Sequence, residues 1–408
     1  MSEVVDRQLV LGLGGTVGYE LRWDSAVFDR LAFEHRVRRH ELTSTAPIVD
    51  ERSLLIAVLA LVAAGAGAER FVASSEVVEA FAAHFTHDVT LGGTGVRAGL
   101  VLASLGIPSV QHLVSIDDNV RRLLPAGVSY VCSAVRDTLD PHLIVQYPVG
   151  AHVRLMDADI LSPAANRLIF ANDPPNREML LAPELGDELA TASAFLVSGF
   201  NTMQDHDLLE RRLDELGRAM DRLPDDALVF YEDAGFYMRA FAETVRRRLL
   251  DRIDVYSLNE DELQEYLGRT VALLDPADVV RALAEIRALI PVPALVVHTR
   301  HWAVAVGPEA ARHRDALESA VRVAATRFRL GDGFTAAQAE ETADLPRHEG
   351  GGALVAATEQ TLPGAVGIPG FLLDVAQPTT IGLGDTFVGG FLAAHARVAE
   401  TAPDGGRR

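Results

Sequence analysis

The stretch "ALVFYEDAGFYMRAFAETVRRRLLDRIDVYSLNEDELQEYLG" (residues 227–268) alternates short apolar runs with longer amphipathic ones. The runs at 227–233 and 254–259 are the kind of apolar segment that predicts strands buried on both faces. The stretches at 234–250 and 260–267 carry apolar residues at helical spacing, so each predicts a helix. Strands that alternate with helices of this length predict a parallel sheet covered by helices on both faces.

The same alternation continues on both sides of this stretch. Further buried strands are predicted at 8–14, 194–200 and 294–299, and further helices at 207–223 and 277–289. The apolar stretch 54–68 is shorter than a membrane-spanning helix, which needs about 18 residues or more, so it predicts a buried helix. The fold class is therefore α/β, with a three-layer body.

Two segments carry short alternating runs such as "VQHLVS", "HLIVQY" and "HVRLM", which predict a small, mostly antiparallel lid. The predicted lid segments are 19–47 and 109–173, inserted into a body formed by 1–18, 48–108 and 174–408. Flexibility is expected only around "RHEGGGAL" (347–354) and in the tail 401–408.

Composition excludes several classes of protein. The formal net charge of −20 over 408 residues argues against a nucleic-acid or anionic-membrane partner. The single cysteine, Cys132, excludes an intramolecular disulfide, and with an N-terminus unlike a signal peptide it predicts a cytoplasmic protein. The chain contains no lysine, which excludes P-loop, protein-kinase and pyridoxal-phosphate chemistry.

The sequence "TTIGLGDTFVGGF" (379–391) places a Gly-x-Gly-Asp turn before an apolar helix. Gly382 and Gly384 leave the backbone bare, and the amides that open a helix suit a phosphate or a developing anion. A carboxylate there would repel such a ligand unless it accepts a proton from an attacking hydroxyl, which is the role predicted for Asp385. The alternative is that Asp385 only caps the helix.

Polar residues follow several of the predicted strands, namely Asn201, Glu232, Asn259 and His298. Ligands of parallel sheets bind at this edge. Asn259 and Glu262 are three residues apart and could hold a hydrated Mg²⁺, with Glu232 as a third ligand from a neighbouring strand. The alternative for the first two is a capping box at the start of a helix.

Taken together, these motifs resemble the ADP-dependent glucokinase and phosphofructokinase family of the ribokinase-like superfamily. "NEDE" and "GLGD" match the family's Asn-Glu-x-Glu and Gly-x-Gly-Asp. "LGGTGVRAG", "NRLIFAND", "LVSGFN" and "VVHTRHW" match its sugar loop, Asn-Arg strand, substrate strand and His-Thr segment. The matches occur in family order from residue 9 to residue 391.

The resemblance implies a ribokinase-like body, a lid, and transfer of a phosphoryl group from ADP to a sugar hydroxyl with Mg²⁺, leaving AMP. Asp385 would be the base, and the amides of Gly382, Leu383 and Gly384 would form the anion hole. The remaining implied roles are metal binding by Glu262, Asn259 and Glu232, nucleotide binding by His298 and Thr299, and substrate binding by Gly92, Gly93, Asn201 and Arg167.

Two departures from the family concern the acceptor. Gly18 stands where the family carries an Asp that binds sugar hydroxyls, which predicts a roomier pocket, poor activity with glucose and fructose 6-phosphate, and a gain in activity on Gly18→Asp. Glu20 or Asp24 could supply the missing acceptor instead. The family's His-x-Glu becomes Phe230-Tyr231-Glu232, and Arg97, Arg154 and Arg167 are candidates for a phosphate on the acceptor.

Two other classes of function compete with this interpretation. A Gly-rich turn follows the first strand at 12–18, as in dinucleotide-binding oxidoreductases, but its spacing is one residue too long for that fingerprint. A catalytically degenerate kinase fold that binds a sugar or nucleotide would explain Gly18. Retention of both Asp385 and Glu262 speaks against it, because a binding protein needs neither a base nor a metal site.

Overall fold

The computed structural model describes residues 7–375, 379 and 382–401, with side chains described as far as residue 396. Its large sheet has the strand order β16-β15-β14-β13-β12-β11-β1-β5-β6, and all neighbours are parallel except β14–β15 and β15–β16. The strands are β1 (Gln8–Leu11), β5 (Ser109–Leu113), β6 (Val128–Cys132), β11 (Ala192–Val197), β12 (Leu228–Glu232), β13 (Val255–Asn259), β14 (Ala294–His298), β15 (Trp302–Val306) and β16 (Val366–Pro369).

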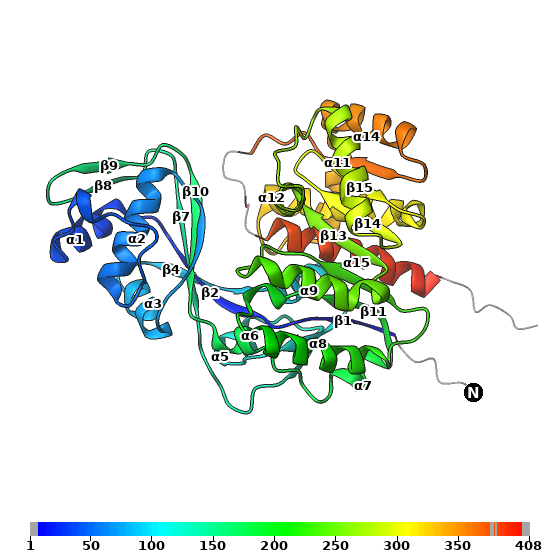
Figure 1. The fold of residues 1–408 in the computed structure, drawn as a ribbon, viewed down its shortest axis with the longest axis horizontal. Helices are drawn as coiled ribbons and strands as arrows, with labels where there is room; N and C mark the ends of the chain where they lie inside the picture. The colour runs from blue at the N-terminus through cyan, green and yellow to red at the C-terminus, as the bar shows by residue number, and fades with distance from the viewer. Residues whose placement is uncertain (1–6, 376–378, 380–381, 402–408) are drawn as a thin grey trace, which may run out of the picture.

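Helices cover both faces of this sheet (Figure 1). One apolar core joins it to α8 (His206–Met220), α9 (Arg239–Leu249), α10 (Glu260–Leu267), α11 (Pro276–Leu289) and α14 (Glu349–Thr361). A second core on the other face joins it to α4 (Thr94–Ser104), α12 (Arg314–Leu330) and α15 (Leu383–Thr401). The predicted three-layer α/β/α fold is confirmed.

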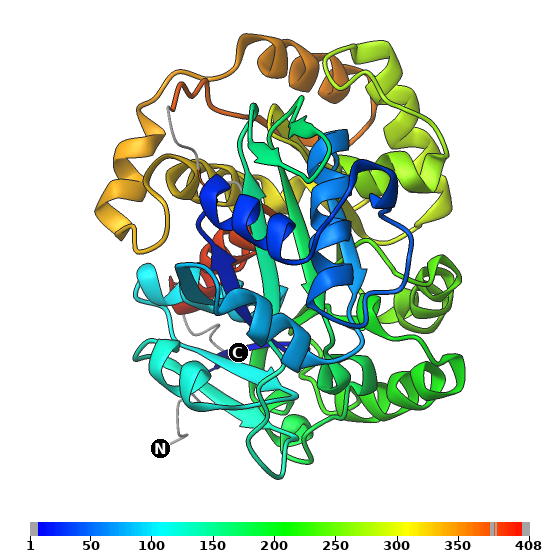
Figure 2. The same ribbon diagram turned by 90° about the vertical axis from the view of Figure 1, so that its left-hand side faces the viewer.

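A second sheet lies beside the body, at the left of Figure 1. Its strand order is β3 (Ala68–Phe71), β10 (Asn166–Ala171), β7 (His142–Tyr147), β2 (Thr16–Leu21) and β4 (His87–Gly92). Its outer face packs on α1 (Ser25–Glu34), α2 (Glu51–Ala64) and α3 (Ser75–Ala82), which lie in front of the strands in Figure 2. The other face is turned toward the body, and we call it the inner face.

The remaining elements are short. They are α5 (Asp118–Leu123), β8 (His152–Arg154), β9 (Asp159–Leu161), α6 (Pro174–Glu178), α7 (Leu185–Leu189), α13 (Ala336–Ala343), and 3-10 turns at Arg39–Glu41, Phe200–Thr202, Leu250–Arg252 and Ala310–His313.

Several strands fall in the other sheet from the one predicted. Segments β5 and β6, predicted for the lid, belong to the large sheet, whereas β3 and β4, predicted for the body, belong to the second sheet. The sequence misleads at β5 because Gln111 and His112 are polar but fully buried. His112 Nε2 accepts from the amide of Ala182 at 2.8 Å, and burial lowers the pKa of His112 to about 4. The second sheet also mixes two parallel with two antiparallel pairs.

The stretch 347–354, predicted to be flexible, instead enters helix α14. His348 caps this helix and accepts from the amide of Gly351 at 3.0 Å. A Cβ atom at Gly351 would lie 2.2 Å from the carbonyl oxygen of His301, so this glycine permits close packing. The tail 402–408 lies outside the described residues.

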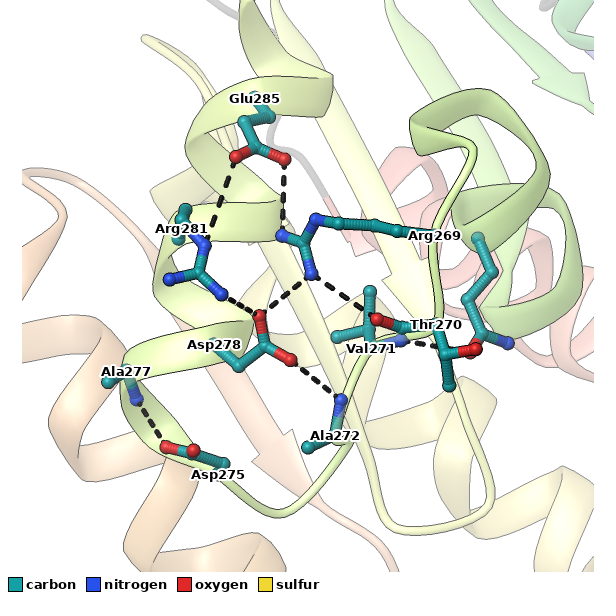
Figure 3. Close-up of polar contacts among 10 residues, drawn as sticks. Arg269, Thr270, Val271, Ala272, Asp275, Ala277, Asp278, Arg281 and Glu285 are labelled. Atoms are coloured by element: carbon teal, nitrogen blue, oxygen red, sulfur yellow. Dashed lines mark hydrogen bonds and ion pairs between the residues drawn. The ribbon is translucent and has the colours of Figure 1, made fainter.

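An ionic network fixes the connection between α10 and α11 (Figure 3). Arg269 donates to Asp278 at 2.8 Å and to Glu285 at 3.1 Å, and Arg281 pairs with both acids. Asp278 also accepts from the amide of Ala272 at 2.9 Å. The network lies directly after the C-terminal end of α10 and ties this end to α11. It thereby helps to hold the helix whose first turn carries Glu262.

Candidate active site

Helix α15 begins at Leu383, directly after Gly382, whose φ of +66° lies in the left-handed region that favours glycine. Asp385 therefore lies inside the first turn and is not the N-cap residue. Gly382 accepts from the amide of Thr386 at 3.0 Å and from its hydroxyl at 2.8 Å. The first turn of a helix carries amides that have no partner within the helix, and Asp385 lies in this turn. Thr380 and Ile381 lie outside the described residues.

Asp385 faces a buried arginine from another helix. Arg97 on α4 is 8% exposed, and its Nε lies 3.9 Å from Asp385 Oδ2. The Nη2 atom of the same guanidinium lies 3.7 Å from Glu20 Oε1 on β2. A Cβ atom at Gly382 would lie 2.7 Å from Arg97 Cδ, so the glycine turn leaves room for this side chain. The arrangement joins the body to the second sheet at Asp385.

The predicted sugar loop lies one helical turn before Arg97. Gly92 ends β4, and Gly93 precedes α4 with a φ of +90°. A Cβ atom at Gly93 would lie 3.0 Å from the Cα atom of Gly15, so two glycine turns pack against each other here. The Arg97 amide donates to the Gly93 carbonyl at 2.9 Å, which connects this loop to the Arg97–Asp385 pair.

Glu232, at the end of β12, meets His298 from the end of β14, although β13 lies between these two strands. Its Oε1 atom lies 3.1 Å from His298 Nε2, and the His298 ring stacks on Phe387 at 4.5 Å between centroids. A Cβ atom at Gly384 would lie 3.5 Å from His298 Cε1 and 3.8 Å from Glu232 Oε1. The motif Phe230-Tyr231-Glu232 lacks the histidine of the family's His-x-Glu. In the structure, His298 from another strand lies beside Glu232, next to the turn that carries Asp385.

Asn259 and Glu262 form the capping box that was the alternative to metal binding. The Asn259 side chain accepts from the amides of Asp261 and Glu262, and Glu262 Oε2 accepts from the Asn259 amide at 2.7 Å. Burial raises the pKa of Glu262 to about 9, and the charges of Glu232 and Asp233 add to this shift. Such a shift means that a positive charge is needed before this carboxyl ionises at neutral pH.

The acids at these strand ends form the candidate Mg²⁺ site. Within the described ranges, no three His, Cys, Asp or Glu side chains are close enough together to hold one metal ion directly. The Oε2 atom of Glu232 is buried and has no hydrogen-bond partner among the residues that the structure describes. An unpaired buried carboxylate oxygen near the high-pKa carboxyl of Glu262 suits a hydrated cation, which needs few direct protein ligands.

Asp233 was missed in the sequence, although it lies beside Glu232. Its Oδ2 atom accepts hydroxyl hydrogen bonds from Tyr256 and Tyr266, both at 2.6 Å. Burial raises the pKa of Asp233 to about 6. The sequence does not indicate that tyrosines from β13 and α10 donate hydrogen bonds to Asp233, because these partners are distant in the chain.

The other predicted site residues occupy strand ends or the second sheet. Asn201 lies in the turn after β11 and donates to the carbonyl of Gly235 at 3.5 Å. Thr299 holds the β14–β15 turn through the amides of His301 and Trp302, and His298 is buried, so nucleotide binding by this pair stays a prediction.

The two further arginines predicted as anion ligands lie apart from Asp385. Arg167 on β10 lines a groove of about 1110 Å³ with Glu69 and Gln146 on the second sheet. Arg154 pairs with Asp29 of α1 at 3.1 Å and is exposed. Of the arginines proposed from the sequence, Arg97 is the one that lies beside Asp385.

Two networks at the junction of the sheets also escaped prediction. Asp173 Oδ2 lies 2.8 Å from both His142 Nε2 and Asn176 Nδ2, and Asn176 Nδ2 also donates to the Gly15 carbonyl at 2.9 Å. Glu69 of β3 accepts from the Tyr237 hydroxyl after β12 at 3.3 Å. Both networks connect residues that are far apart in the sequence, so no local sequence pattern could predict them.

The space beside Gly18 is not open. A Cβ atom there would lie 2.9 Å from Thr90 Oγ1 and 3.2 Å from Ile144 Cδ1, so the expected roomier pocket is not present at this position. Thr90 Oγ1 donates to Glu20 Oε1 at 2.8 Å. Glu20 lies two residues beyond Gly18, on the same inner face of the second sheet. Asp24, the other acid considered, caps α1 instead.

We expect Gly18→Asp to destabilise the protein and not to raise activity, contrary to the sequence-based expectation. The new carboxylate would crowd Thr90 and lie beside Glu20, and overpacking of this kind typically costs about 1–3 kcal/mol. Urea unfolding of the variant measures this cost. A stable variant with a tenfold higher kcat/KM for glucose would contradict this account of the pocket.

The fold and this site define a three-layer α/β protein with an aspartate in a glycine turn at the N-terminus of a helix. The family model described as the ADP-specific phosphofructokinase/glucokinase conserved region matches residues 16–390. The chain therefore belongs to the ADP-dependent phosphofructokinase/glucokinase family of sugar kinases. A comparison with curated proteins finds no significant match.

Solved structures agree over nearly the whole chain. A phosphofructokinase from Pyrococcus horikoshii OT3, solved with AMP, has a TM-score of 0.76 and 18% identity, covering 97% of this chain and 99% of that one. An ADP-dependent kinase in complex with fructose-6-phosphate and ADPβS has a TM-score of 0.68 and 14% identity, covering 98% and 96%. At such low identity, these TM-scores show a shared fold. No helix in the described ranges is long and apolar enough to cross a membrane.

Proposed function

We propose that this protein transfers the β-phosphoryl group of ADP to a hydroxyl of a sugar or sugar phosphate and releases AMP. The observation that carries the proposal is the position of Asp385 in the first turn of α15, where it faces Arg97, which also pairs with Glu20 of the second sheet. Membership of the ADP-dependent sugar kinase family supports ADP as the donor.

The residues of this chain supply three contributions to such a transfer. Asp385 accepts the proton of the attacking hydroxyl. The amides of Gly382, Leu383 and Gly384 stabilise the charge that develops on the transferred phosphoryl group. Glu262, Asn259 and Glu232 would hold Mg²⁺ through water, and the ion would neutralise charge on the phosphates of the donor.

The acceptor is proposed as a hexose or hexose phosphate, since the family comprises both glucokinases and phosphofructokinases. Arg167, with Glu69 and Gln146, lines the groove of the second sheet and would contact the far end of the acceptor. The alternative of a binding protein without catalysis is not favoured, because Asp385 and the acidic strand ends are all in place.

A donor screen tests this function. Purified protein is incubated with Mg²⁺, a hexose and hexose-phosphate panel, and either ADP or ATP, and AMP and ADP formation are measured. We expect turnover with ADP to exceed that with ATP by at least about tenfold, equivalent to about 1.4 kcal/mol in transition-state binding. Acceptor-dependent turnover with ATP alone would contradict the proposed donor.

A further inference from the structure

A cavity of about 390 Å³ adjoins the candidate active site, between helix α4, strand β4 and the segments that follow α5 and α12. Its volume lies within the range of pockets that bind small molecules. Arg97 and Thr386 belong to its described lining, whereas Glu20 and Asp385 do not. The cavity is therefore a separate space that shares the Arg97 side chain with the site.

Two buried arginines line this cavity, Arg97 with 8% and Arg327 with 3% of its surface exposed. Arg327 Nε donates to Asp332 Oδ1 at 2.7 Å. Asp332 is the one acid among the described lining residues, and its side chain is 70% exposed. The lining thus carries two buried guanidinium groups and one carboxylate in contact with solvent. This excess of one positive charge favours a ligand with a single negative charge.

Arg97 can donate hydrogen bonds to such a ligand. Glu20 and Asp385 approach its guanidinium to 3.7 and 3.9 Å, which is longer than a hydrogen bond. Both acids are in partial contact with solvent, which weakens their repulsion of an anion in the cavity. A guanidinium carries five N–H donors, and buried donors are normally satisfied. A carboxylate in the cavity would accept from these donors.

The hydroxyl groups of the described lining already donate within the protein. Thr90 donates to Glu20 at 2.8 Å, Thr386 to the Gly382 carbonyl at 2.8 Å, and Ser104 to the Leu100 carbonyl at 3.1 Å. Their hydrogens are therefore in use, and we assign the charged end of the ligand to Arg97.

The rest of the cavity is mainly apolar. It follows α4 from Arg97 to Ser104, which is about two turns or about 10 Å along the helix axis. Its apolar walls include Leu100, Val101, Leu123, Pro125 and Phe334. Phe334 is buried and packs with Val101 in a small core cluster, so this wall is fixed by the fold. A hydrocarbon group suits this end of the cavity.

We propose that this cavity is an effector site for a small amphipathic monocarboxylate, with its carboxylate on Arg97 and its hydrocarbon part along α4. The site goes beyond the proposed function and does not depend on it, whereas its effect on catalysis rests on that function. An anion that draws Arg97 into the cavity removes the group that joins Asp385 to Glu20 of the second sheet. We expect occupancy to lower kcat by at least about fivefold, at the lower end of typical coupling between two sites.

Calorimetry on the full chain, without nucleotide or sugar, tests the site. The probes are cyclohexanecarboxylate, cyclohexanecarboxamide and cyclohexylmethylamine, which share one ring and differ in the charge of the head group. We expect the carboxylate to bind at least about tenfold more tightly than the amide, because its hydrogen bonds to a guanidinium are charge-assisted, and the amine to bind least. Equal binding of the three probes, or no binding of the carboxylate, would overturn the proposal.

Two variants locate the binding in this cavity. Asp332→Asn removes the lining carboxylate and should tighten binding of cyclohexanecarboxylate by about 2-fold to 5-fold, the effect of one exposed charge. Asp344→Asn, which removes an exposed acid outside the cavity, is the matched control and should change nothing. Equal affinities of these two variants would place the carboxylate elsewhere.

Ala103→Phe fills the apolar end of the cavity with its ring. It should abolish binding of the carboxylate and leave kcat unchanged, since Ala103 lies away from Asp385. Thermal unfolding shows whether this variant is folded, and if it is not, the comparison of Asp332→Asn with Asp344→Asn decides. A folded Ala103→Phe protein that still binds the carboxylate as tightly as the wild type would contradict the proposal.

Kinetics with saturating cyclohexanecarboxylate separate this inference from the proposed function. Lower kcat in the wild type but not in Ala103→Phe would support the effector role. Binding of the carboxylate by a protein that transfers no phosphoryl group from ADP would support the site and refute the kinase function. Phosphoryl transfer that the bound carboxylate does not change would refute the effector role alone.

Discussion

Asp385→Asn is expected to lower kcat by about 10²-fold to 10⁴-fold, the usual contribution of a general base. Asparagine has the same shape as aspartate and can still occupy the first turn of α15, but it cannot accept the hydroxyl proton. Binding of ADP and of the acceptor should therefore change little. Steady-state kinetics together with calorimetric binding measure the two effects separately.

Asp315→Asn is the matched control, because Asp315 is an exposed acid in the first turn of α12. It removes a carboxylate from the start of a helix without touching the site, so its kcat should equal that of the wild type. If Asp385→Asn kept full turnover, Asp385 would have only a structural role at the start of α15, and the proposed mechanism would be wrong.

The second large effect concerns pH and Glu262. Its pKa is about 9 in the folded protein against an ordinary value of 4.5, so the folded state holds this proton more tightly. The stabilisation is complete below about pH 4.5 and is lost as the pH rises toward 9. Without metal, we expect the free energy of unfolding to fall by at least about 2 kcal/mol from pH 5 to pH 9 because of this group.

Urea unfolding across this pH range, for the wild type and Glu262→Gln, measures this effect. The glutamine variant keeps the capping hydrogen bond but cannot ionise, so it should lose this part of the pH dependence and be more stable than the wild type at pH 8. Glu265→Gln, on the exposed side of α10, should retain the wild-type slope. Parallel pH profiles for wild type and Glu262→Gln would show that Glu262 is not the responsible group.

Added Mg²⁺ provides an independent readout. If Glu262 is a metal-site residue, Mg²⁺ should stabilise the wild type at pH 8, because a cation favours the ionised carboxyl. Glu262→Gln should be stabilised less. Equal stabilisation of both proteins would remove Glu262 from the metal site.

Much of the fold could be predicted because its strands are continuous apolar runs that alternate with amphipathic helices. The strands at β11, β12, β13 and β14 follow from this pattern. The allocation of strands to the two sheets could not be predicted in the same way. Gln111 and His112 are polar residues in a fully buried strand, and tertiary partners such as the Ala182 amide decide that they lie inside.

The candidate site divides along the same line. Asp385, Asn259 and Glu262 could be found because a glycine turn and a capping pattern are local in the sequence. The pairing of Glu232 with His298 and the approach of Arg97 to Asp385 and Glu20 depend on the fold. Gly18 led to the wrong expectation of open space, because Thr90 and Ile144 from neighbouring strands occupy it.

Transfer of a labelled phosphoryl group tests the central claim most directly. ADP carrying ³²P in its β-phosphate is mixed with the wild-type protein, Mg²⁺ and the best acceptor of the panel, and the products are separated. The account predicts labelled sugar phosphate and unlabelled AMP in equal amounts, and almost none of either with Asp385→Asn. Label that remains in the nucleotide or appears as free phosphate, with no labelled sugar, would contradict the account.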